Sequence, residues 1–178
     1  MILKYFEIKK INLEKTKFIL FYGKNEGLKK DSINSILNNG KIALQQYDEK
    51  EVLENQSEFT EKIFTKSLFE EKKTILINRC SDKILKIIDE IVNKNPDDTL
   101  IFLNAENLEK KSKLRSFFEK NTKCVCIAFY PDNEQTLSKI TFDFLRMKKI
   151  SISSLNVNLI INKCFGDRGI LIKELEKI

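Results

Sequence analysis

Length, composition and charge already narrow the range of possible functions. The chain has 178 residues, of which 42% are hydrophobic and 33% charged, and it contains no histidine and no tryptophan. This length allows a substantial core, whereas the absence of histidine excludes Ser-His-Asp and Cys-His catalytic systems and histidine zinc sites. The net charge of +6 comes from 28 lysines and 4 arginines against 26 acidic residues. Arginine is the preferred residue for contacts with phosphates and bases, and nearly all of the positive charge here is lysine. The net charge is therefore only a weak indication of nucleic-acid binding.

Five short apolar runs predict the strands of a sheet. Several are apolar at consecutive positions, as strands buried on both faces require. They alternate with helical patterns, which is typical of an α/β fold with a parallel sheet flanked by helices. The predicted strands are residues 18–22, 42–44, 74–77, 99–103 and 124–128.

Helical periodicity is clearest over residues 83–92, after a cap at Ser81 or Asp82, and over residues 112–120. Pro131 cannot continue a strand ladder and restricts Tyr130, so the sheet is expected to end there. The pattern beyond it is purely helical. The predicted helices there are residues 134–149, a helix capped by Ser153 or Ser154 and reaching Phe165, and a last one from Asp167 after Gly166.

These patterns predict two domains, an α/β domain over residues 1–130 and a small helical domain over residues 131–178. The last helical pattern is still running at Ile178, without a stop signal. We therefore expect the helical domain to be incomplete at its C-terminus.

The four cysteines do not have the spacing of a metal or redox site. Cys124 and Cys126 lie on one face of a predicted strand, where they are expected to pack as small apolar residues, and Cys80 and Cys164 stand alone. We expect no metal. The chain opens without a signal peptide and has no apolar stretch near 20 residues, so a cytoplasmic location without a membrane span is predicted.

The segment after the first long strand has the position of a phosphate-binding loop but not its chemistry. A P-loop has four residues between its glycines, followed by Lys and Ser or Thr. Here three residues separate Gly23 from Gly27, and Leu28-Lys29 follows. We therefore interpret this segment as a degenerate phosphate loop, at Gly23, Lys24 and Gly27, that does not bind nucleotide.

The acidic pair that an ATPase needs for Mg²⁺ is also missing from the best candidate strand. That strand, residues 99–103, continues as Asn104-Ala105-Glu106, so one carboxylate is present without the aspartate before it. Asp97 and Asp98 follow Pro96 and are interpreted as a solvated pair in a turn. We expect no catalytic residue, no cofactor and no intrinsic enzymatic activity.

Three stretches, in this order along the chain, resemble signatures of one family. Residues 20–27, LFYGKNEG, resemble its opening motif. Residues 67–69, SLF, precede a basic strand as in its second motif, and residues 108–115, LEKKSKLR, leading to YPD at 130–132, resemble its third. The family is the delta subunit of the bacterial DNA polymerase III clamp loader, and the resemblance extends over almost the whole chain.

The resemblance implies a AAA+ α/β domain that has lost ATP binding, followed by a helical lid, with the family's collar domain absent here. It implies a non-catalytic subunit of a nucleotidyltransferase holoenzyme that binds the sliding beta clamp and helps to open it. The other partners implied are the gamma/tau and delta prime subunits, if the native protein has a collar, and primed DNA indirectly. No membrane partner is implied, and the location is the nucleoid-associated replisome.

Carried onto this sequence, the clamp-contacting pair is Leu68 and Phe69. From the residues alone, the alternative is that both belong to the core, as Ile63 and Phe64 just upstream are expected to do. A second group is a possible contact to DNA phosphates, with a solvated helix face as the alternative because Glu106, Glu109 and Glu119 lie near it. This basic cluster consists of Lys110, Lys111, Lys113 and Arg115.

Two other functions stay open. One is an active nucleotide hydrolase that uses a non-standard loop around residues 23–27. The other is a basic nucleic-acid-binding module. Two features count against it, the scarcity of arginine and the lack of interleaved aromatic and basic residues.

Overall fold

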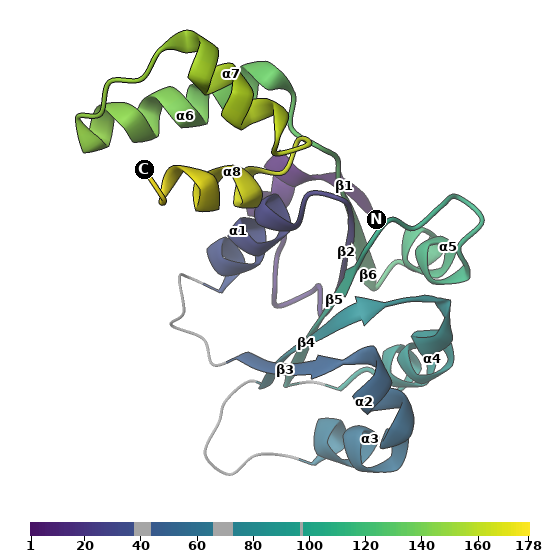
Figure 1. The fold of residues 1–178 in the computed structure, drawn as a ribbon. Coiled ribbons are helices and arrows are strands. Elements are labelled where there is room, and N and C mark those ends of the chain that lie inside the picture. The colour runs from purple at the N-terminus through teal and green to yellow at the C-terminus, as the bar shows by residue number, and fades with distance from the viewer. Residues whose placement is uncertain (38–43, 66–72, 97) are drawn as a thin grey trace. The chain divides into compact units, whose positions relative to one another are not determined.

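The computed structural model describes residues 1–37, 44–65, 73–96 and 98–178. They form two compact units (Figure 1). The first comprises residues 1–23 and 32–128, and the second comprises residues 24–31 and 129–178. Among the described residues, no helix is both long and apolar enough to cross a membrane.

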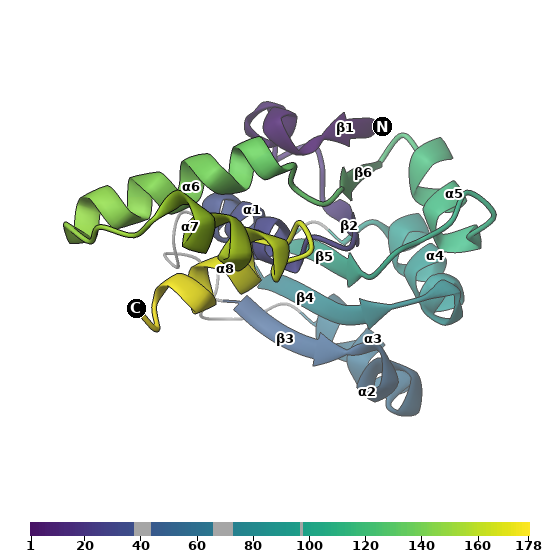
Figure 2. The same cartoon turned by 45° about the horizontal axis from the view of Figure 1, so that its top comes forward.

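A six-stranded sheet forms the centre of the first unit. Its strand order is β1-β6-β2-β5-β4-β3, which Figure 2 shows in succession. The pairings of β1 with β6, β2 with β5, β5 with β4 and β4 with β3 are all parallel. The strands are β1 (Ile2–Lys4), β2 (Phe18–Gly23), β3 (Leu44–Asp48), β4 (Lys73–Cys80), β5 (Thr99–Ala105) and β6 (Cys124–Phe129).

Burial follows the apolar runs of the sequence. All six residues of β2 are buried, and β5 and β6 are buried at all but one position each, as expected for strands covered on both faces. The predicted strands at 18–22, 74–77, 99–103 and 124–128 are confirmed. Of the predicted strand 42–44, residues 42 and 43 lie outside the described residues. The strand β3 begins at Leu44 and is a partly exposed edge strand.

Helices cover both faces of the sheet (Figure 1). Helices α2 to α5 lie on one face, where Val52, Ile88 and Phe118 pack with inward-facing residues of β2, β4, β5 and β6. The part of α1 in this unit lies on the opposite face, with Ile33 buried. The elements are η1 (Tyr5–Lys10), α1 (Glu26–Ile36), α2 (Glu49–Glu54), α3 (Gln56–Phe64), η2 (Asp82–Ile84), α4 (Leu85–Lys94) and α5 (Lys113–Lys120).

Cysteine packing agrees with the expectation from the strand pattern. Cys124 and Cys126 are fully buried in the core of the first unit. Burial raises the pKa of each thiol to about 12, so both stay protonated and apolar at neutral pH.

Besides the first part of α1, the second unit contains the helices α6 (Glu134–Lys148), α7 (Ser154–Asn162) and α8 (Arg168–Leu175). Each begins after a residue whose side chain accepts a hydrogen bond from a first-turn amide, namely Asn133, Ser153 and Asp167. The helices share a core that includes Leu137, Leu145, Val157, Ile161, Leu171 and Leu175. The predicted helices and their starts are confirmed, but α7 ends at Asn162 and not at Phe165 as predicted.

In the first unit, one carboxylate connects η2 to the start of α5. Asp82 accepts hydrogen bonds from the Ser112 hydroxyl (2.6 Å) and from the amides of Leu114 (2.9 Å) and Lys113 (3.0 Å). Burial raises the pKa of Asp82, but these hydrogen bonds outweigh it, and the pKa lies below its usual value. A carboxylate whose pKa is lowered by folding stabilises the fold in its charged form.

We therefore expect Asp82→Asn to lower the free energy of unfolding at pH 7 by about 1 kcal/mol or less, since the side chain is partly exposed. The stabilisation is present above the unfolded-state pKa of about 4 and is lost as the pH falls through the lower folded-state pKa. Urea unfolding between pH 7 and pH 3 measures this, with Asp143→Asn as a control. If Asp82→Asn lowered the free energy of unfolding by the same amount at pH 7 and at pH 3, the assigned role of the Asp82 carboxylate would be contradicted.

Candidate functional site

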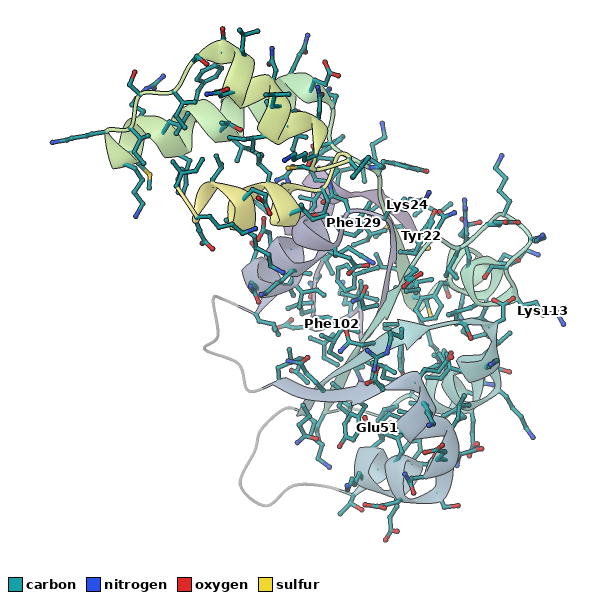
Figure 3. The ribbon with its side chains drawn as sticks, in the orientation of Figure 1. Tyr22, Lys24, Glu51, Phe102, Lys113 and Phe129 are labelled. Atoms are coloured by element: carbon teal, nitrogen blue, oxygen red, sulfur yellow. The ribbon has the colours of Figure 1, made fainter. Side chains whose placement is uncertain are left out.

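The turn between β2 and α1 occupies the position of the degenerate phosphate loop. Gly23 ends β2 with a φ of 124°, a conformation that other residues rarely adopt. Its amide donates to the Glu106 carbonyl at 2.9 Å. Only Lys24 and Asn25 connect Gly23 to the first residue of α1, and the Lys24 side chain is exposed. Figure 3 labels Lys24 next to Tyr22 of β2.

This connection is too short to wrap a phosphate in the manner of a P-loop. Gly27, which the sequence placed as the second loop glycine, lies in the first turn of α1. Lys29 is a candidate cation further along the helix, but it is buried, and its ammonium contacts the Glu26 carboxylate at 2.6 Å. Thus, of the three residues in the predicted position, only Lys24 presents a charged group to solvent.

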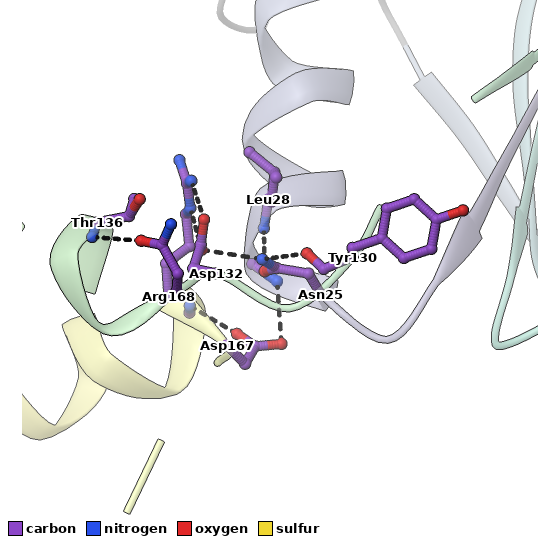
Figure 4. Close-up of polar contacts among 10 residues, drawn as sticks. Asn25, Leu28, Tyr130, Asp132, Thr136, Asp167 and Arg168 are labelled. Atoms are coloured by element: carbon purple, nitrogen blue, oxygen red, sulfur yellow. Dashed lines mark hydrogen bonds and ion pairs between the residues drawn. The ribbon is translucent and has the colours of Figure 1, made fainter. Parts of the chain in front are cut away.

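The amides of the first turn of α1 donate to groups of the protein itself (Figure 4). Asn25 is fully buried, and its side-chain oxygen accepts from the Leu28 amide at 3.1 Å. Its side-chain nitrogen donates to the Tyr130 carbonyl at 3.2 Å and to the Asp132 carboxylate at 2.9 Å. Asn25 therefore caps α1 and also connects it to the start of the helical segment that follows residue 129.

Asp167 supplies acceptors to the remaining amides. Its Oδ2 accepts from Glu26 at 2.8 Å and, more weakly, from Gly27 at 3.4 Å. Its Oδ1 accepts from Gly169 at 2.7 Å and from Ile170 at 3.2 Å, in the first turn of α8. We call this set of contacts the Asp167 bridge. It joins two helix N-termini through one carboxylate.

Two glycines allow these helix ends to approach closely. A Cβ placed on Gly27 would lie 2.2 Å from the Gly169 nitrogen and 2.6 Å from its Cα. A Cβ on Gly169 would likewise lie 2.8 Å from the Cα of Gly27. Because these neighbours are backbone atoms, a larger residue at either position would separate the helices.

A buried ion pair lies next to the Asp167 bridge. The Arg168 guanidinium donates to both oxygens of Asp132, at 2.6 and 2.8 Å, in a bidentate arrangement. The Asp132 side chain is 6% exposed and that of Arg168 is 18% exposed. The same Asp132 accepts from Asn25, so the pair also reaches the first turn of α1.

Near the ends of β5 and β4, side-chain amides are found where an ATPase would need carboxylates. Asn104, near the end of β5, donates from its side chain to the Asn78 side chain at 3.2 Å. Glu106 follows β5 and is exposed. Over the described ranges, no group of three or more His, Cys, Asp or Glu could hold a metal ion.

The basic cluster lies at and just before α5. Lys110, Lys111 and Lys113 are exposed, and Figure 3 shows Lys113 pointing outward. Arg115 is instead 18% exposed, and its guanidinium contacts Glu119 at 2.7 Å and the face of the Tyr22 ring at 4.8 Å. The hydrogen bond to Glu119 raises the pKa of Arg115. Lys110 and Lys113 are thus available to an anionic partner. The ammonium of Lys111 contacts the exposed Glu109 carboxylate at 3.0 Å, and Arg115 already has partners in the protein.

The predicted clamp-contacting pair, Leu68 and Phe69, lies outside the described residues, as does Asp97. The residues on either side of the pair's segment are described. Ile63 is buried in the core and Phe64 packs against it, as the sequence predicted. Lys73, at the start of β4, donates its ammonium to the carbonyls of Lys62, at 2.7 Å, and Thr65.

Sequence reasoning did not identify the roles of Asn25, Asp132, Asp167 and Arg168. The sequence predicted that the last helix starts at Asp167, and in the structure Asp167 is the cap just before α8. Its contacts with Glu26 and Gly27 join residues about 140 positions apart. No local pattern indicates a contact of that range.

Three solved structures illustrate the similarity of this fold to known proteins. A search for related sequences among curated proteins gives no match. The Bacillus subtilis DNA clamp loader delta protein matches with a TM-score of 0.58 and 14% identity, over 97% of this chain and 55% of that one. The Thermotoga maritima RuvB Holliday junction branch migration motor matches with a TM-score of 0.60 and 15% identity, over 96% of this chain and 56% of that one. Domain III of the Thermotoga maritima replication initiation protein DnaA matches with a TM-score of 0.55 and 14% identity, over 94% of this chain and 78% of that one.

These likenesses show the fold, which is that of the AAA+ and P-loop proteins. The chain spans 55% of the length of the B. subtilis protein. The family model for the DNA polymerase III delta subunit matches residues 19–128, which is more than half of the chain. The chain therefore belongs to the DNA polymerase III delta subunit family.

Proposed function

We propose that this chain binds the sliding beta clamp and helps to open the ring for loading onto primed DNA, without hydrolysing nucleotide itself. The observation that carries the proposal is the family match, because its range of 19–128 includes the Leu68–Phe69 segment. The role is mechanical. A subunit that binds the opened ring more tightly than the closed ring offsets part of the cost of separating the ring interface.

The surroundings of Leu68 and Phe69 support their role as the contact pair. Seven residues, 66–72, connect Thr65 to Lys73, and the Lys73 ammonium contacts the Thr65 carbonyl directly. Lys73 also donates its amide to the Asp98 carbonyl at 2.8 Å, next to β5. The described residues on both sides of the segment that carries Leu68 and Phe69 are therefore held by hydrogen bonds.

We expect Leu68→Ala combined with Phe69→Ala to weaken clamp binding by about 3 kcal/mol or more, because a Leu-Phe pair filling an apolar pocket lies in the hot-spot range. Calorimetric titration with the cognate clamp measures this. The matched control is Leu155→Ala with Phe142→Ala, which removes an exposed Leu and Phe elsewhere. Loss of cooperative unfolding by circular dichroism in the Leu68/Phe69 variant would show that the pair belongs to the core instead.

The alternative of an active nucleotide hydrolase is tested by titration with ATP and Mg²⁺. We expect no binding in the micromolar range, because the first-turn amides of α1 already have acceptors within the protein. The variants to compare are Lys24→Ala and, as a control on the same segment, Lys30→Ala. Micromolar binding that Lys24→Ala abolishes and Lys30→Ala does not would overturn the non-catalytic proposal.

The basic cluster is proposed to contact the DNA backbone within the loader, chiefly through Lys110, Lys111 and Lys113, with Arg115 as a weaker candidate. Replacing the three lysines by alanine is expected to reduce the slope of log affinity against log salt for primer–template DNA by about 2 to 3. A control triple variant at exposed lysines of the second unit uses Lys139, Lys148 and Lys163. If the unsubstituted chain bound primer–template DNA with an affinity that did not change with salt concentration, the result would argue against the proposal.

A further inference from the structure

The Asp167 bridge differs from the other helix caps of the second unit. Asn133 and Ser153 each accept from one first-turn amide of their own helix, at 2.8 and 3.3 Å. Asp167 accepts from its own helix through Oδ1 and from a helix far away in the sequence through Oδ2. Its carboxylate therefore serves two helices at once.

Electrostatics explains why a charged group is needed between these helices. The N-terminus of an α-helix carries about half a positive charge. The starts of α1 and α8 are in backbone contact at Gly27 and Gly169, so two positive ends face each other at short range. A carboxylate between them replaces this repulsion by two attractions, and it satisfies amides of both first turns.

In P-loop proteins the helix after the first strand receives a phosphate group at its N-terminus. Here the helix in that position, α1, receives the carboxylate of Asp167 from the same chain. A bound nucleotide and Asp167 would compete for the same amides. The chain itself thus supplies the acceptor for the Glu26 and Gly27 amides.

We propose that Asp167 is a built-in substitute for a nucleotide phosphate, which holds the first turn of α8 against the first turn of α1 permanently. The inference does not depend on clamp binding. It assigns a reason for the close Gly27–Gly169 contact, and it gives the second unit a fixed arrangement that needs no nucleotide.

Substitution by asparagine separates this role from that of an ordinary cap. Asparagine caps helices about as well as aspartate, so Asp167→Asn keeps an acceptor for Gly169 and Ile170. Its NH₂ group cannot accept from Glu26 or Gly27, and the charge is lost. Asp167→Ala removes both acceptors, and Ser153→Ala removes only the cap of α7.

Residue-resolved amide hydrogen exchange on the chain tests the proposal. In Asp167→Asn, we expect exchange at Glu26 and Gly27 to accelerate by about tenfold or more, with Gly169 and Ile170 changing by less than about threefold. In Asp167→Ala all four amides are expected to accelerate. Ser153→Ala is expected to affect the start of α7 without changing Glu26 or Gly27.

Unchanged exchange at Glu26 and Gly27 in Asp167→Asn would overturn the proposal, because Asp167 would then be only the cap of α8. The asparagine variant also keeps the test decisive if Asp167→Ala fails to fold, since it preserves the cap that α8 needs.

Discussion

The complete burial of β2 is the constraint on which the rest of the structure depends. A strand buried along both faces needs neighbours on each side and helices above and below. In this chain β6 and β5 lie beside it, and helices cover both faces of the sheet. The chain leaves β2 through Gly23 and enters α1 after only two residues. The first-turn amides of α1 must then find acceptors nearby, and Asn25 and Asp167 provide them.

The described part of the chain has the fold of the AAA+ and P-loop proteins, and we propose that its internal contacts take the place of a nucleotide. In this proposal, the short turn stands where a phosphate loop would be, the side-chain amides near the ends of β4 and β5 stand where an acidic pair would be, and the Asp167 carboxylate stands where a phosphate would be. The buried pair of Asp132 and Arg168 adds a second connection to the same first turn. We infer that the delta family member represented here depends on fixed internal contacts where an ATPase depends on a ligand, which suits a subunit proposed to act by binding a ring.

Much of this fold could be predicted from local sequence patterns. Consecutive apolar residues identified four strands, and polar residues before apolar periodicity identified Ser112, Ser153 and Asp167 as helix starts. The edge strand β3 was largely missed because Gln45 and Gln46 are exposed and polar. Helices α2 and α3 were not predicted, although Val52, Phe59 and Ile63 have suitable spacing. The long-range partners of Asp167 could not be predicted, because nothing near Glu26 or Gly27 indicates a carboxylate from a distant helix.

The most direct measurement of the central claim is the affinity of the chain for its cognate sliding clamp, measured first without nucleotide and then with ATP and Mg²⁺. The account predicts saturable binding in both conditions with the same dissociation constant, because the proposed contact pair lies within residues 19–128, which match the delta family model, and the proposed role of the Asp167 bridge involves no nucleotide. Clamp binding that is absent without ATP and appears on its addition would contradict it.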